Sequence, residues 1–199
     1  MSMDEEKTEL LKSQKEAASQ EEKKWNEIIA AESDEYGENL VSSFAELEKV
    51  VKLMTENFQR GTSGIDPAAL DGLWKIFLGT RKATVDAYEV KNSNPQLFRE
   101  KITNAAMKTI DGLFHADSFS DRGSSFWHSL QPPKFFIEGG LEDDYGIKTY
   151  IPNTGQSPDL TREFIASGNG EKITKVLQPG FLDVSSGKVI REAIIETAG

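Results

Sequence analysis

The side chains best suited to catalysis or metal binding are two histidines, His115 and His128. They are thirteen residues apart, and neither belongs to an H-x-x-x-H pair or has a third ligand at metal-binding spacing. Ser124 and Ser125 lie close to His128, but the G-x-S-x-G turn that exposes a serine nucleophile does not surround them. The sequence therefore predicts surface or helix-end histidines, no metal or cofactor, and no enzymatic activity. An enzyme acting through either histidine is the least favoured interpretation.

Phosphate binding is also disfavoured. Residues 61–64 (GTSG) lack the lysine and the preceding strand of a phosphate-binding loop, so we expect a turn between helices. The chain has 23 Lys and Arg against 33 Asp and Glu, and its net charge of -10 repels nucleic acid.

The sequence also bears on the cellular location. It has no cysteine, which fits a reducing compartment. No apolar run approaches the roughly 18 residues that a membrane span needs, and the acidic N-terminus has no apolar signal segment. We expect a cytoplasmic protein with neither a nucleic-acid nor a membrane partner.

The breakers of secondary structure divide the chain. Residues 1–60 contain one glycine, Gly37, and no proline, whereas nine of the sixteen glycines lie from residue 139 onward. Helices tolerate few such residues, and turns between short strands need them. The order of helices first and strands last predicts an α+β fold.

Residues 1–60 are expected to form one long helix, kinked or frayed near Gly37. Six apolar residues step by four and three along its second half, which is a heptad stripe of dimer or bundle core: Leu40, Phe44, Leu47, Val51, Met54 and Phe58. Glu48, Lys52, Glu56 and Arg60 are placed on the polar face. The first half has a thinner stripe, which favours a solvated coiled coil over partial disorder.

Residues 61–115 should hold two short bundle helices. Asp66-Pro67 and the Asn92–Pro95 turn mark their starts. Each helix has one apolar face, so we expect the two to pair with each other and with a second copy in a dimeric four-helix bundle. Residues 116–140 have no clear period and are interpreted as a linker or ordered loop. Short strands are expected at residues 147–151, 173–177 and 188–197, within a β domain spanning residues 141–199.

Two segments of this β domain carry a resemblance to a known family. Residues 173–181 (ITKVLQPGF) join an apolar strand to Gln-x-Gly-aromatic, and residues 187–195 (GKVIREAII) are similar to Gly-Arg-x-apolar-Arg-x-Ala-apolar-apolar. Residues 141–147 (LEDDYGI) and 157–165 (SPDLTREFI) are similar to two further family segments. From residue 141 onward the chain thus resembles GrpE, the nucleotide-exchange factor of DnaK-type chaperones. It departs from the family pattern at Arg162, Phe164, Lys188 and Glu192.

The resemblance implies a homodimer that binds the ATPase domain of a DnaK-type chaperone and accelerates ADP release, with no cofactor of its own. It places the chaperone contact on and beside the last strand: Arg191, Lys188, Phe181, Gln178, Ile190 and Arg162. For Arg191, an ion pair within the chain, near Glu192 or Asp183, remains an equal alternative. Gly180 and Gly187 are expected to be turn glycines. The alternative function is a dimeric coiled-coil scaffold or adaptor without exchange activity.

Overall fold

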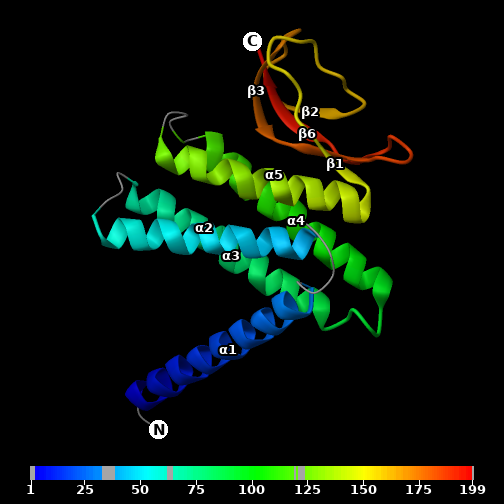
Figure 1. Ribbon diagram of the computed structural model, residues 1–199. Coiled ribbons are helices and arrows are strands. Elements are labelled where there is room, and N and C mark those ends of the chain that lie inside the picture. The colour runs from blue at the N-terminus through cyan, green and yellow to red at the C-terminus, as the bar shows by residue number, and fades with distance from the viewer. Residues whose placement is uncertain (1–2, 33–38, 62–64, 119, 121–123, 199) are drawn as a thin grey trace.

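The computed structural model describes residues 3–32, 39–61, 65–118, 120 and 124–198. In this part of the chain five helices come first and six short strands last (Figure 1), which confirms the predicted α+β order. Among the same residues, none of the helices combines the length and the apolar character that a membrane span requires.

The single long helix expected over residues 1–60 is instead two helices, α1 (Met3–Glu32) and α2 (Leu40–Gln59). The expected kink at Gly37 falls outside the described residues. α2 begins with its own N-cap, because the side chain of Asn39 accepts a hydrogen bond from the backbone nitrogen of Ser42 at 2.8 Å.

The chain folds back between these two helices. Trp25 of α1 donates its indole N–H to Glu48 of α2 at 2.7 Å. In one straight helix these residues would lie roughly 35 Å apart. Glu48, which was expected on the polar face, is consequently buried between the helices.

The apolar stripe of α2 is covered within the chain. Phe58 is 38 % exposed, and the other members are at most 3 % exposed: Leu40, Phe44, Leu47, Val51 and Met54. α5 and α3 pack against α2, and in Figure 1 α2 and α5 lie side by side. The stripe is therefore bundle core, and a dimer seam along α2 would need surface that this chain already covers.

The helices α3 (Pro67–Tyr88) and α4 (Pro95–Ser118) begin where the sequence predicts. Asp66 accepts a hydrogen bond from the backbone nitrogen of Ala68 at 3.2 Å, and Asn94 accepts one from that of Leu97 at 3.0 Å. Their apolar faces join the core that α2 enters, through Leu70, Leu73, Phe77, Val85, Ile102, Ala106, Ile110 and Leu113.

Most of the segment expected to be a linker is helix α5 (Ser125–Tyr145). Pro132 and Pro133 suggested irregular chain, but the helix continues through both. Proline costs a helix interior about 3 kcal/mol, which the burial of one apolar face offsets through Phe126, Leu130, Pro133, Ile137 and Leu141. Gly140 allows α2 to approach closely, since a Cβ there would lie 2.8 Å from the Cα of Leu40.

The β module follows α5 directly, and two three-stranded sheets form it. One has the order β1-β4-β5 and the other β2-β6-β3. The strands are β1 (Ile147–Tyr150), β2 (Glu163–Ser167), β3 (Ile173–Gln178), β4 (Gly180–Asp183), β5 (Val189–Arg191) and β6 (Ala193–Thr197). The last expected strand is thus divided at Glu192 between the two sheets, and β2 and β4 were not predicted.

The two glycines expected in turns differ. Gly187 has a φ of +67° in the turn between β4 and β5, as predicted. Gly180 lies in β4, and its φ is not positive. A Cβ at Gly180 would stand 2.7 Å from the backbone nitrogen of Ala193, so this glycine allows the two sheets to approach closely.

Candidate functional site

Arg191 is paired within its own chain. Its Nη1 and Nη2 atoms donate to the carboxylate of Asp111, on α4, at 2.7 and 2.5 Å, and Nη2 also donates to the carbonyl of Pro179 at 2.8 Å. The guanidinium carbon lies 4.5 Å from the ring centroid of Phe181, the residue opposite Arg191 in the β4–β5 pairing. The expected intramolecular ion pair thus exists, but the partner of Arg191 is Asp111 of α4 rather than a residue near Glu192 or Asp183 in the sequence.

Two further residues of the predicted contact set belong to the same junction. Gln178 donates its side-chain amide to Asp111 at 2.9 Å. Phe181 is fully buried and forms part of the core shared with the helices. Phe181 was expected to touch a partner, and in this structure its side chain has no exposed surface to offer one.

Lys188 and Ile190 are exposed on the hairpin of β4 and β5. The turn of this hairpin is fixed by Asp183, which accepts hydrogen bonds from the hydroxyls of Ser185 and Ser186 at 2.6 and 2.8 Å. These bonds lower the pKa of Asp183 to about 2. The hairpin therefore presents a lysine and an isoleucine on an ordered turn.

Arg162 is exposed and lies in the turn before β2. Its Nε is 3.6 Å from Asp159, and its guanidinium carbon is 6.0 Å from the ring centroid of Tyr150. Beside it, the buried carboxylate of Glu163 accepts hydrogen bonds from the hydroxyl of Tyr150 at 2.5 Å and from the backbone nitrogen of Asp159 at 2.9 Å. Burial and then the bond to Glu163 raise the pKa of Tyr150 to about 12.

The six predicted contact residues thus divide into two groups. Lys188, Ile190 and Arg162 are available to a partner. Gln178, Phe181 and Arg191 join the β module to the helices. Sequence reasoning missed Asp111, because its partners lie 67 and 80 residues further along the chain.

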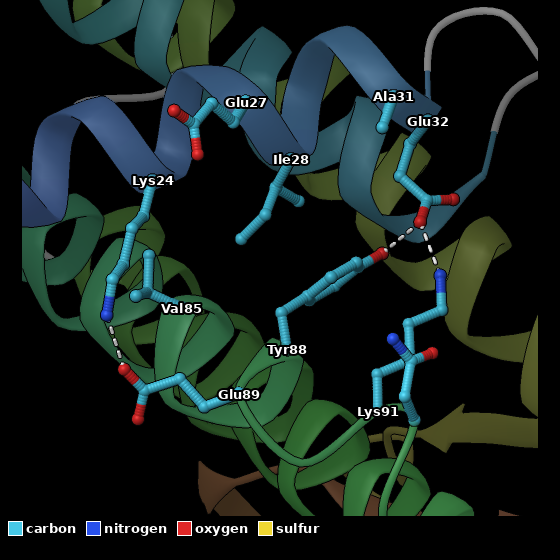
Figure 2. A pocket seen from close by; sticks show the side chains of 10 residues that line it. Lys24, Glu27, Ile28, Ala31, Glu32, Val85, Tyr88, Glu89 and Lys91 are labelled. Carbon is cyan, nitrogen blue, oxygen red and sulfur yellow. Dashed lines mark hydrogen bonds and ion pairs between the residues drawn. The ribbon is translucent and has the colours of Figure 1, made fainter.

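A cleft of about 440 Å³, which no sequence pattern predicted, lies between α1 and the end of α3. Figure 2 shows a polar contact at each end of the cleft. Lys24 donates a hydrogen bond to Glu89 at one end, and at the other end Tyr88 and Lys91 donate to Glu32, each at 2.6 Å. Ile28 and Val85 line the space between these two bridges.

The electrostatics of the cleft follow from these bridges. Burial alone would raise the pKa of Glu32, but hydrogen bonds from Lys91 and Tyr88 outweigh it and hold that pKa below its ordinary value. Burial and the bond to Glu32 raise the pKa of Tyr88. Glu32 is therefore charged at neutral pH, and two ion pairs span the cleft, Lys91 with Glu32 and Lys24 with Glu89.

Two more cavities, of about 440 and 320 Å³, lie between α3 and α4. Ile76 lines both of them. Small residues leave the space on either side of it: Gly72, Gly79, Ala83, Ala105 and Gly112. Lys75 and Lys108 border the smaller cavity.

The two histidines are exposed and separate. The ring of His115 stands against Phe114 and that of His128 against Trp127. Among the described residues, no group of three or more His, Asp or Glu side chains could hold a metal ion. When the chain is compared with models of known protein families and with curated proteins, none of them matches it.

Proposed function

We propose that this protein is a GrpE-like nucleotide-exchange factor, which binds the ATPase domain of a DnaK-type chaperone and accelerates ADP release in the cytoplasm. The observation that carries the proposal is the placement of the family-like segments. Residues 173–181 and 187–195 form β3 to β6 of one small module, and this module stands at the end of a helical bundle.

Such a protein needs no covalent chemistry. It would bind the open, nucleotide-free form of the chaperone more tightly than the closed, ADP-bound form and so shift the equilibrium between them. A shift from mostly closed to mostly open requires roughly 5 kcal/mol of differential binding. A β module that contacts one lobe while the helices contact the other would supply it.

Lys188 and Ile190 are the proposed centre of the contact. They are exposed on an ordered hairpin and belong to the family-like segment, and Arg162 supplies a second exposed cation. An aliphatic side chain beside a lysine suits an acidic surface with an apolar depression.

The direct test is the rate of ADP release from a DnaK-type chaperone, measured with a fluorescent ADP analogue. We expect acceleration by the wild-type protein and clearly weaker acceleration by Lys188→Ala. Lys172→Ala, at an exposed lysine of the same module outside the family-like segments, is the matched control. No acceleration at saturating wild-type protein would refute the proposal.

The proposed exchange factor is a homodimer, and we place its interface on α3 and α4. The two cavities on either side of Ile76 leave apolar surface of α3 and α4 that a second copy could cover in a self-complementary contact. Lys75 and Lys108 suit a second copy because the chain carries a net charge of -10. In sedimentation, the wild type should have twice the chain mass and Ile76→Lys the mass of one chain. A monomeric wild type would contradict this interface.

An adaptor without exchange activity is the second candidate. It is favoured by the use of Arg191 and Gln178, two family-like residues, within the chain. Binding of the chaperone without faster ADP release would select it.

A further inference from the structure

Three side-chain hydrogen bonds between the β module and the helices converge on Asp111. Its two carboxylate oxygens accept hydrogen bonds from both terminal nitrogens of Arg191 and from the amide of Gln178. The Asp111 side chain is 15 % exposed and that of Arg191 is 31 % exposed, so water screens this pair less than a surface ion pair. Asp111 therefore connects α4 to the ends of two strands that belong to different sheets, β3 and β5.

The Arg191 side chain is itself held from two other directions. Its Nη2 donates to the carbonyl of Pro179, and its guanidinium group lies over the ring of Phe181. A planar guanidinium with a bidentate carboxylate has one favourable orientation. The Asp111 contact consequently fixes direction as well as distance.

The remaining connections at the junction are less directional. Lys148 of β1 donates to Glu142 of α5 at 3.2 Å, but these side chains are 59 % and 38 % exposed, and an ammonium group lacks the fixed fork of a guanidinium. One residue, Gly146, separates α5 from β1, and its carbonyl accepts a hydrogen bond from the backbone nitrogen of Val184 at 2.8 Å. Phe181 and Ile147 bury their side chains in the helical core. Apolar burial is non-directional, so a short hinge and an apolar contact do not by themselves set the angle of the module.

We propose that Asp111 is a positioning residue: it sets the angle between the β module and the helical bundle through Arg191 and Gln178. The functional consequence of this inference rests on the proposed exchange function. A module that contacts one chaperone lobe while the helices contact the other must be held at a fixed angle. Arg191 then serves the chaperone contact indirectly, through Asp111.

The angle can be measured without the chaperone. The chain has no cysteine, so Gln59→Cys on α2 and Lys172→Cys on the β module, both at exposed positions, accept two spin labels. The labelled chain is mixed with an excess of unlabelled protein, so that a dimer carries at most one labelled copy. Double electron–electron resonance should then give one narrow distance distribution, and a clearly broader one with Asp111→Ala or Asp111→Asn. Asp143→Ala, which removes an exposed acid of α5, is the control and should leave the distribution narrow.

The second readout is the effect on exchange. A β module held at the wrong angle would lose its contact with one chaperone lobe and with it part of the differential binding that favours the open form. We therefore expect Asp111→Ala and Arg191→Ala to lower saturating ADP release alike, by at least about tenfold. Chaperone affinity should change much less. The double variant Asp111→Arg with Arg191→Asp exchanges the charges of the pair. It should restore a narrow distance distribution.

The outcomes separate the two proposals. An unchanged narrow distribution in both Asp111 variants overturns the positioning role, whatever the activity. Weaker chaperone affinity in Arg191→Ala with normal affinity in Asp111→Ala also overturns it, and makes Arg191 a direct contact. If the wild type does not accelerate ADP release, the exchange function fails, while the distance measurement still decides the role of Asp111.

Discussion

The helices α1 and α2 are adjacent in the chain and are held by different forces. α2 buries an apolar stripe of five residues in the core. Among the α1 side chains that the structure describes, from residue 12 onward, Trp25 is fully buried and Ile28 and Ile29 are only partly buried against the core. Polar bridges also attach this helix, such as Glu21–Arg81 at 2.9 Å and Glu32–Lys91 at 2.6 Å. A cleft remains beneath it (Figure 2). Apolar burial is insensitive to pH and dilute salt, whereas polar bridges are not, so α1 should be the separable element.

The largest effect is expected in α2. Phe44→Ala should lower the free energy of unfolding by about 3–5 kcal/mol, because the side chain is fully buried and its removal leaves a cavity. Urea denaturation measures this. Phe58→Ala, at the exposed end of the same stripe, should cost clearly less. Equal losses would mean that burial does not distinguish the two positions.

The next effect concerns Trp25, the fully buried side chain of α1. Trp25→Phe keeps an aromatic ring and removes the indole N–H that Glu48 accepts, at a cost of roughly 1–3 kcal/mol. The loss should be local: hydrogen exchange should become faster over residues 21–32 and stay slow over residues 44–54. Uniformly faster exchange would show that α1 and α2 unfold together.

A smaller effect should follow acidification. The pKa of Glu32 is lower in the folded protein than its ordinary value. The ionised Glu32 side chain therefore contributes fully to the stability of the folded state above the unfolded pKa of about 4.3. That contribution is lost as pH falls through the lower folded pKa. Hydrogen exchange over residues 21–32, corrected for intrinsic rates, should rise in this range. In Glu32→Gln, protection should already be weaker at neutral pH, and this acid step should be absent.

The smallest change is expected at the surface of α2. Lys52 pairs with Glu48 at 2.8 Å, but its side chain is 55 % exposed. Lys52→Ala should cost only roughly a few tenths of a kcal/mol, as surface ion pairs do. If Lys52→Ala lowered the free energy of unfolding as much as Trp25→Phe, the buried Glu48 carboxylate would need Lys52 to remain ionised.

Local signals in the sequence determined a large part of this fold. The caps at Asp66 and Asn94, the turn at Gly187 and the spacing of the α2 stripe each act over a few residues. Their effects are therefore readable in sequence order. Local signals did not predict helix α5, which contains two prolines. Its apolar face stabilises the helix only through packing against α2 and α4, which local signals do not report.

Tertiary structure alone decided which side chains meet. Trp25 finds Glu48 because α1 folds back, and Arg191 finds Asp111 because α4 passes beneath the β module. Heptad spacing predicts that Leu47 and Val51 are buried, but it does not predict whether the same chain or a second copy covers them. Hydrophobic burial specifies how much surface must leave water, whereas the partner of a charged group depends on where distant segments bring its counter-charge.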